Sequence, residues 1–502
     1  MRIKSNKRMA LIIILSLVLF YLSCSYNIGK AEELIQASAA IHISSTISDG
    51  KYSIPEISQI ARLNNIKVVI FTDRDLMRWE YGIWPLRNII KKTVESSSVF
   101  KYGISRYLNE IRKAQERNPD LVLISGVESA PFYYWQGSPF DNSLKMYNWH
   151  KHILVIGLEK AADYRDLPVI GNREALRIPF RLKDAYRLWP ILILLTGIIC
   201  LRKRQFRYKD LRGRHLSPYS RPWRICGVAL IIFGLLFFWN NFPYCELKYD
   251  KYKGDSGIKP YQNFIDYVNQ RGGLTFWAHP EAENIQRIGR IDLETREHTV
   301  DLLEAKNYTG FSIFYEGYKK VGLPGGTWDE VLKQYCQGIK AGPIWAIAGL
   351  SFDQSGELTS RMKALRTVLL IPKLGKEEVL QALREGRMYV MRGENCSQFI
   401  LDKFIIGDIS TGSEATIGEE ILLKYNPRID ISGYFLDRQN KPIRIKLIRN
   451  GKIVKAFQVY SPFNVSYQDD YDGGGKRFYY RLEIQSQGLL LVTNPIFVVK
   501  KV

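Results

Sequence analysis

The sequence predicts an α/β fold in which a barrel-like set of strands and helices is followed by an all-β domain. The first supporting observation is a set of seven short apolar runs, each ending in polar residues that a metal ion or a phosphate group could use. Because these runs are apolar along their whole length, they are typical of strands buried on both faces, as in parallel sheets. The runs are Ala40–Ser44, Lys67–Asp75, Leu121–Glu128, His152–Gly157, Leu274–His279, Phe311–Glu316 and Ile344–Asp353.

The second observation is that helix-like stretches lie between several of these runs. Strands that alternate with helices and end in polar residues indicate a barrel-like α/β enzyme, whose functional site lies at the carboxyl ends of the strands. The helix-like stretches include Pro55–Asn65, Ser105–Asn118, Tyr261–Arg271 and Trp328–Lys340.

The residues at the strand ends occur in an order that resembles the PHP family, which is named for polymerase and histidinol phosphatase domains. The similarity covers about residues 35–395 and is interrupted once. Six landmarks occur in the family's order, and together they are specific although each alone is weak. They are Ile41-His42-Ile43-Ser44 with Ser48-Asp49-Gly50 and Pro55-Glu56, then Thr72-Asp73-Arg74-Asp75, Gly126-Val127-Glu128, His152-Ile153-Leu154, His279-Pro280 and Ala348-Gly349-Leu350-Ser351-Phe352-Asp353.

The resemblance implies a distorted seven-stranded (β/α) barrel that holds up to three divalent metal ions and most often hydrolyses phosphate esters. Three of the usual ligand positions depart from the family, with Ser44, Arg74 and Ser351 in place of two histidines and an aspartate. A hydroxyl is a poor ligand for a divalent ion, and a guanidinium cannot be one. Asp353 replaces a histidine but can still ligate. The positions that keep the family's residue are His42, Asp49, Glu128, His152 and His279.

These losses are not spread evenly over the three implied metal sites. The residues that match Glu128, His152 and His279 share one ion in the family, and all three are retained. The resemblance therefore implies one remaining site for Zn, Mn or Fe, with Asp353 as a further candidate ligand, although the site could also be without metal. The second site has lost half of its ligands, which would be His42, Ser44, Glu128 and Ser351.

The third implied site leads to a hypothesis about Arg74. Its other positions are Asp49 and Asp353, so we expect a salt-bridged triad in which the guanidinium replaces a lost ion. The candidate catalytic residues are accordingly His42, Asp49 and Arg74, with Arg74 orienting an anionic substrate.

Simpler interpretations of single histidines remain open. A histidine beside apolar residues, such as His42, is more often a hydrogen-bonded core residue than a ligand. His150 and His152 are equally compatible with the edge of a strand. His215 and His298 belong to no motif, and we expect both at the surface.

The interruption of the barrel pattern consists of two apolar segments, Leu188–Leu201 and Ile225–Trp239. Aromatic residues flank both, and the loop between them, residues 202–224, holds nine Lys or Arg and one acidic residue. This charge density fits a short cytoplasmic loop between two transmembrane helices. The alternative is a helical hairpin buried inside the globular part.

The amino terminus agrees with a membrane topology. Four basic residues precede an apolar run from Met9 to Tyr26, which could be a cleaved signal peptide, a lipoprotein signal or an uncleaved anchor, the last being the simplest interpretation. With the amino terminus inside, both halves of the barrel and the carboxyl-terminal domain lie outside a bacterial cytoplasmic membrane. The lipid bilayer is therefore an expected partner, whereas protein partners are not indicated.

The net charge of +22 follows largely from this topology, because the first eight residues contribute +4 and the basic loop +8, which leaves +10. A nucleic-acid-binding protein would gather Lys and Arg on one soluble face or carry a known reading motif. Neither is recognisable, so we expect no nucleic-acid partner and attribute the basic residues to topology and to anionic lipid head groups.

After the barrel pattern, helical periodicity gives way to short runs, which are Ile429–Phe435, Ile443–Arg449, Lys452–Tyr460, Phe478–Ile484 and Leu489–Val499. The pair Asn450-Gly451 between two of them is a strong hairpin signal. The pattern predicts a β-sandwich. The expected domains are residues 1–30 as anchor, 31–185 and 245–394 as the two halves of the barrel, 186–244 as the transmembrane hairpin, and 395–502 as the sandwich.

Two hypotheses of different classes follow. The first is a membrane-anchored metal-dependent hydrolase, phosphoesterase-like, with a reduced metal site and a small anionic substrate. The second is a catalytically inactive protein with this fold that binds a ligand or a partner at the cell surface. A hydrolase of carbon–oxygen bonds is a weaker third alternative.

Overall fold

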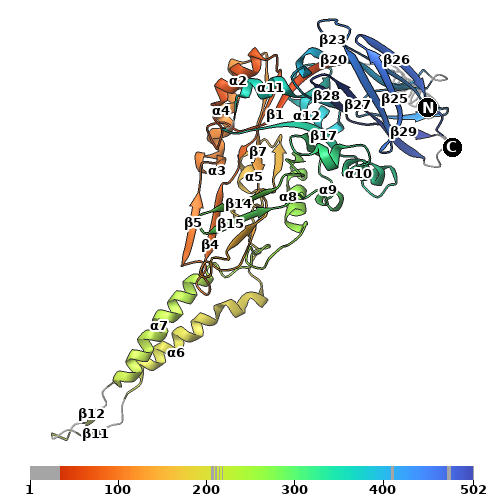
Figure 1. Cartoon of the computed structure of the whole chain (residues 1–502). Coiled ribbons are helices and arrows are strands. Elements are labelled where there is room, and N and C mark those ends of the chain that lie inside the picture. The colour runs from red at the N-terminus through yellow and green to blue at the C-terminus, as the bar shows by residue number, and fades with distance from the viewer. Residues whose placement is uncertain are drawn as a thin grey trace, which may run out of the picture.

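The computed structural model describes residues 34–204, 208–209, 212–213, 215–216, 219–354, 356–408, 412–471 and 476–500. Figure 1 shows an α/β body, a pair of helices that projects from one end of it, and an all-β part against the other end. The mixed α/β class is therefore confirmed. The predicted anchor, residues 1–30, lies outside the described residues, as does part of the basic loop.

The strands of the body pair in a series that returns to its first member. β1 pairs in parallel with β2 and with β17, which joins the two ends of the series. The path between them runs through β6 beside β2, β7 beside β3, and then through β10, β13 and β16. The bounds are β1 (Ile35–Ile43), β2 (Val68–Phe71), β3 (Asp73–Arg74), β6 (Val122–Ile124), β7 (Gly126–Ser129), β10 (Ile153–Ile156), β13 (Leu274–Trp277), β16 (Gly310–Phe314) and β17 (Trp345–Phe352).

All seven predicted runs thus form strands, but one direction differs from the expectation. β10 is antiparallel to both of its neighbours, β7 and β13, whereas a parallel sheet was expected. All four of its residues are buried. A strand that is covered on both faces is apolar along its length in either direction, so the apolar pattern carries no information about direction.

Helices accompany this series of strands, and the four predicted stretches correspond to α2, α4, α8 and α10. α2 begins with a capping box between Ser53 and Glu56, and Pro55 stands in its first turn. α12 ends at Gly386, whose left-handed φ of 72° suits a residue without a side chain. The bounds are α2 (Ile54–Leu63), α3 (Val99–Tyr102), α4 (Ile104–Arg117), α5 (Ala161–Arg165), α8 (Lys259–Asn269), α9 (Asp301–Glu304), α10 (Thr327–Cys336), α11 (Leu358–Ala364) and α12 (Lys376–Glu385).

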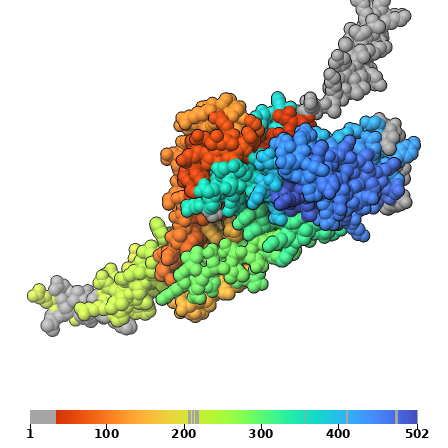
Figure 2. All heavy atoms as spheres, turned by 45° about the horizontal axis from the view of Figure 1, so that its top comes forward, coloured from red at the N-terminus to blue at the C-terminus, as the bar shows by residue number. Residues whose placement is uncertain are grey.

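The two apolar segments form the helices α6 (Trp189–Arg202) and α7 (Arg221–Asn241), which pack side by side and project away from the body (Figures 1 and 2). Their backbones approach closely at Gly197 and Gly227, where a side chain would not fit. A Cβ on Gly227 would lie 2.7 Å from the carbonyl oxygen of Gly197. In an apolar 18-residue window of each stretch, only 22% of the residues of Leu182–Arg202 and 11% of those of α7 are buried, which argues against the alternative of a buried hairpin. Both stretches are long and apolar enough to cross a membrane.

The carboxyl-terminal part consists of two packed sheets. The turn at Asn450 and Gly451 joins β24 to β25 with positive φ angles of 47° and 77°, which confirms the predicted hairpin. One sheet contains β20 (Phe399–Gly407), β21 (Glu414–Ala415), β23 (Arg428–Phe435) and β26 (Phe463–Gln468). The other contains β22 (Glu420–Leu423), β24 (Pro442–Arg449), β25 (Lys452–Tyr460), β27 (Arg477–Ser486), β28 (Leu489–Thr493) and β29 (Ile496–Lys500).

The second of these sheets is continuous with the body. β28 pairs with β19 (Met388–Arg392), β19 with β18 (Leu365–Ile371), and β18 with β1. Because backbone hydrogen bonds cross the boundary, the two parts share one sheet rather than only a packed interface.

Two small sheets beside the body were not predicted. The hairpin of β4 (Arg78–Gly82) and β5 (Lys91–Glu95) is one of them. The other brings β8 (Tyr134–Gln136) and β9 (Lys145–Tyr147) against β14 (Asn284–Ile288) and β15 (Ile291–Thr295). It therefore joins segments that come before and after the helix pair in the sequence.

Candidate metal centre

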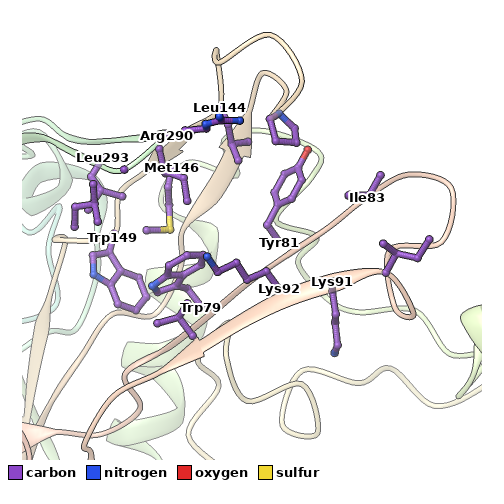
Figure 3. A pocket seen from close by; sticks show the side chains of 16 residues that line it. Trp79, Tyr81, Ile83, Lys91, Lys92, Leu144, Met146, Trp149, Arg290 and Leu293 are labelled. Carbon is purple, nitrogen blue, oxygen red and sulfur yellow. The ribbon is translucent and has the colours of Figure 1, made fainter.

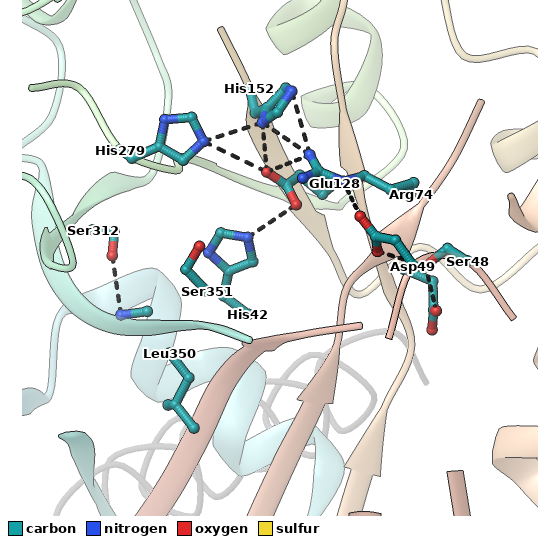
Figure 4. Close-up of polar contacts among 12 residues, drawn as sticks. His42, Ser48, Asp49, Arg74, Glu128, His152, His279, Ser312, Leu350 and Ser351 are labelled. Carbon is teal, nitrogen blue, oxygen red and sulfur yellow. Dashed lines mark hydrogen bonds and ion pairs between the residues drawn. The ribbon is translucent and has the colours of Figure 1, made fainter. Parts of the chain in front are cut away.

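The predicted site residues from the strand ends gather around one carboxylate, that of Glu128 on β7 (Figure 4). Its Oε2 lies 3.0 Å from Nε2 of His42, at the end of β1. Its Oε1 lies 2.8 Å from Nη1 of Arg74, 2.7 Å from Nδ1 of His152 and 3.7 Å from Nε2 of His279. The predicted meeting of Glu128 with His279 is therefore confirmed, although 150 residues and the helix pair separate them.

Three of these groups are spaced as ligands of a common ion. The atoms Oε1 of Glu128, Nδ1 of His152 and Nε2 of His279 are 2.7, 3.1 and 3.7 Å apart. Ligands at about 2.0–2.2 Å from one zinc ion lie about 3.3–3.6 Å from one another in a tetrahedron. His279 is buried and its Nδ1 has no hydrogen-bond partner among the described residues. The three separations lie on both sides of this range, so small shifts of the side chains would bring a donor set of suitable type around one divalent ion.

A further histidine belongs to the cluster. The ring of His150 stacks on that of His279 at 4.4 Å, and ligand atoms of His150, His152 and His279 all lie within 4.8 Å of one another. Sequence reasoning treated His150 as the edge of a strand. The sequence feature that indicates His150 is its position two residues before His152. Residues two apart in an extended segment lie on the same side, and both histidines come just before β10.

The protonation states of these groups suit a metal ligand set. Burial, followed by the charge of Arg74, lowers the pKa of His152 to about 4, so this imidazole is neutral at pH 7. Burial opposes the ionisation of Glu128, but the charge of Arg74, with His42 and His152, holds the pKa of its carboxyl well below the usual value. A neutral imidazole and an ionised carboxylate are the forms that bind a divalent ion.

Arg74 pairs with one of its two predicted carboxylates, Asp49, and with Glu128. Its Nε lies 3.0 Å from Oδ2 of Asp49, and its Nη1 lies 2.9 Å from Nδ1 of His152 as well as against Glu128. Burial lowers the pKa of this guanidinium, but Glu128, Asp49 and Asp353 together raise it above its usual value. The predicted pair with Asp49 is therefore present, Glu128 is an additional partner, and the charge of Asp353 also acts on Arg74. That the guanidinium replaces a lost ion stays a prediction.

The loop that carries Asp49 is held in place by hydrogen bonds to the buried side chain of Asp73. Asp73 accepts hydrogen bonds from the hydroxyl groups of Ser45 and Ser48, at 3.0 and 2.7 Å. Gly50 lies so close to the preceding turn that a Cβ there would be 2.1 Å from the carbonyl oxygen of Ser44. Burial raises the pKa of Asp73 to about 6. Asp73 is thus a positioning residue for the loop and not a member of the cluster itself.

The orientation of His42 depends on an irregularity in β1. The register to both neighbouring strands shifts between Ile41 and Ile43, and His42 has a positive φ of 69°. Bulges of this kind turn a side chain out of the alternation of its strand. A backbone angle that is rarely adopted by residues other than glycine is retained where the surrounding structure enforces it, which is common at functional sites.

The predicted surface position of His298 is wrong. It was expected at the surface, but its side chain is buried near Trp277, with ring centroids 5.6 Å apart. Burial and then the charge of Lys151 lower its pKa well below the usual value. The side chain of His215 is not among those described.

Replacing Arg74 by histidine tests whether the guanidinium stands in for an ion. We expect Arg74→His to bind about one more divalent ion per chain, because Asp49 and Asp353 would regain an imidazole partner. Metal content of the purified protein measures this, with Arg78→His on β4 as a matched control. An Arg74→His protein that is folded but binds no additional metal would contradict the hypothesis.

Comparisons with known proteins give only distant likenesses. No family profile matches the sequence, and no curated protein matches it. Among solved structures, a two-domain protein from Bacteroides vulgatus, named for a predicted PHP-like metal-dependent phosphoesterase, shares 10% identity at a TM-score of 0.35, with 90% of this chain and 91% of that chain covered. A candidate metal-dependent phosphoesterase from Bifidobacterium adolescentis shares 13% identity at a TM-score of 0.27, with 64% and 89% covered. Likenesses this distant do not assign the chain to a family.

Proposed function

We propose that the chain is a membrane-anchored, PHP-type metal-dependent hydrolase that acts on a phosphoester-like anionic substrate. The observation that carries this proposal is the convergence of Glu128, His152 and His279 at ligand spacing, with His150 beside them. In the proposal, the closed series of strands is a PHP-type barrel. The helices α6 and α7 span the membrane, and both halves of the barrel lie on its outer side.

In this proposal, each residue of the cluster has a separate role in metal binding, orientation of a ligand or substrate binding. Glu128, His152 and His279 would hold one divalent ion, which would supply Lewis-acid polarisation of the substrate and activation of water. His42 keeps the Glu128 carboxylate oriented through the contact at its Oε2. The side chain of Arg74 is 17% exposed, compared with 2% for Glu128, so it is the more accessible of the two and would pair with an anionic substrate oxygen.

A second function has its own supporting observation. Arg74 forms an ion pair of 2.8 Å with the carboxylate of Glu128, whose side-chain exposure is 2%. A fixed cation on a ligand oxygen competes with a divalent ion for the same charge. The alternative is therefore a catalytically inactive protein that uses Arg74 and the residues around it to bind an anionic ligand at the cell surface.

Metal analysis with an activity assay separates the two functions. The full-length protein, purified in detergent and supplied with Mn²⁺ or Zn²⁺, is expected to retain about one ion per chain and to hydrolyse a generic phosphate ester. In His279→Ala, both the ion and the activity are expected to be lost. In the control variant His215→Ala, both are expected to remain. This residue belongs to β12 (His215–Leu216), which lies at the end of the helix pair that is far from the body (Figure 1).

Two outcomes would decide against the hydrolase. Wild-type protein that binds no ion and shows no hydrolysis would favour the binding protein. A bound ion that survives His279→Ala would show that the metal lies elsewhere on the chain.

A further inference from the structure

A cavity of about 800 Å³ lies between the two small sheets of the body, outside the metal centre (Figure 3). Its walls are mostly apolar and aromatic. They include Trp79 and Tyr81 of β4, Met146 of β9, Leu293 of β15, and Trp149, which follows β9 in the sequence. Concave sites with apolar walls and this volume are typical of sites that enclose a small molecule. The cavity therefore offers room for an apolar group of considerable size.

One wall of the cavity, the sheet that contains β9 and β15, continues to residues that contact the metal centre. Trp149 lines the cavity, and its carbonyl oxygen lies 3.2 Å from Nε2 of His152. On the neighbouring strand β15 of the same wall, Thr295 lies two residues, or about 7 Å of strand, beyond Leu293. Its hydroxyl accepts a hydrogen bond of 3.0 Å from the backbone of His150. This wall thus ends at histidines of the cluster.

The rim of the cavity is basic. Lys91, Lys92 and Arg290 line it, and all three are exposed. Lys91 already pairs with Glu80 at 2.9 Å, which leaves Lys92 and Arg290 as the cations that face an incoming ligand. An apolar interior with a cationic rim is complementary to a molecule that has a hydrocarbon chain and an anionic head group.

The cavity also lies at the end of the body from which the helix pair projects. The turn of the β4–β5 hairpin is attached to the end of α7, because Asn88 donates to the carbonyl oxygen of Asn240 at 2.6 Å. Ile83 and Ile90, which flank this turn, line the cavity. In the same turn, Trp84 is 75% exposed. If α6 and α7 span a bilayer, the cavity therefore lies beside its surface.

From these observations we propose that the cavity binds the hydrocarbon chain of a phosphate-bearing amphiphile drawn from the membrane. The chain would lie between the two small sheets, and the phosphate would lie at the basic rim, against Lys92 and Arg290. This inference rests on the proposed function, which anchors the protein in the membrane, and adds to it a binding site for a lipid phosphate. Each methylene group that enters the cavity is expected to strengthen binding about fourfold.

The test uses n-alkyl phosphates of increasing length, titrated calorimetrically into the full-length protein in nanodiscs. Affinity is expected to rise from hexyl to decyl phosphate, whereas inorganic phosphate should bind weakly. The variant Val94→Trp would place an indole in the cavity, because Val94 lines it from β5. We expect about tenfold weaker binding of decyl phosphate to this variant.

The matched control is Thr93→Trp, because Thr93 is exposed on the same strand and does not line the cavity. It should bind decyl phosphate as the wild-type protein does. Lys92→Glu should weaken decyl phosphate binding several-fold, and Lys101→Glu, an exposed lysine of α3, should not.

The outcomes separate this inference from the proposed function. If the wild-type protein hydrolyses a soluble phosphate ester but shows no dependence of affinity on chain length, the cavity proposal is wrong and the hydrolase stands. If chain-length dependence is present and is lost in Val94→Trp, the cavity proposal holds even in a protein without hydrolase activity. Equal binding of decyl phosphate by Val94→Trp and Thr93→Trp would also overturn it.

Discussion

Replacing Glu128 by alanine is expected to remove metal binding and to destabilise the folded protein by about 3–5 kcal/mol. The carboxylate is the common partner of Arg74, His42 and His152, and it is only 2% exposed. Without it, the guanidinium of Arg74 would lose its most buried counter-ion and would stand beside the imidazole of His152. Metal affinity is expected to fall at least about 100-fold, as measured by competition with a chelating dye, and stability is measured by urea denaturation.

A double-mutant cycle with Arg74→Met identifies the cause of this loss. If the uncompensated charge dominates, Glu128→Ala should cost much less in the Arg74→Met background than in the wild-type protein. Glu128→Gln serves as the isosteric control and should lose stability as well, because an amide does not neutralise Arg74. A stable Glu128→Ala protein that keeps its bound ion would show that this carboxylate is neither the ligand nor the centre of the cluster.

Replacing Arg481 by alanine is expected to destabilise the protein by about 3–5 kcal/mol, although the residue is far from the metal centre. Arg481 on β27 of the sandwich forms a bidentate pair with Asp329 on α10 of the body, at 2.9 and 2.6 Å. Both side chains have an exposure of 0%. Asp329 also accepts hydrogen bonds from Tyr479 and from the backbone of Gly325, both at 2.7 Å. Loss of the arginine would leave a buried carboxylate without its counter-ion.

The control for this prediction is a more exposed ion pair on the same strand. Arg477 lies 2.9 Å from Glu420, with side-chain exposures of 33% and 40%. Because solvent screens such pairs, Arg477→Ala should cost less than about 1 kcal/mol. A thermal unfolding series on both variants compares them. Equal effects of the two substitutions would contradict a special role for the buried pair in joining the sandwich to the body.

Several elements of the fold follow from local chemistry and were predicted from the sequence. The predicted helix Ser105–Asn118 corresponds to α4 (Ile104–Arg117), and the run Ile443–Arg449 to β24 (Pro442–Arg449). Apolar periodicity and the Asn-Gly turn are properties of a few neighbouring residues, so a single sequence is sufficient to recognise them. The expected run Leu489–Val499 proved to be two strands, β28 and β29, because Pro495 interrupts it.

The small sheets could not be predicted in this way. β5 has the sequence Lys-Lys-Thr-Val-Glu, and four of its five residues are exposed, so it lacks the apolar pattern of a buried strand. β15 pairs with β9, whose residues come before the helix pair in the sequence. The cavity between these sheets is therefore a product of long-range pairing and left no recognisable pattern in the sequence.

The sequence by itself determined which residue types stand at the strand ends, and hence that a carboxylate and two imidazoles were available for one ion. It also determined the two apolar segments and the basic loop between them. Only the tertiary structure decided that Arg74 contacts Glu128 as well as Asp49, that His150 joins the cluster, that β10 runs antiparallel and that His298 is buried. The physical reason is that local propensity depends on neighbours in the sequence, whereas charge pairing, burial and strand direction depend on which distant segments the chain brings together.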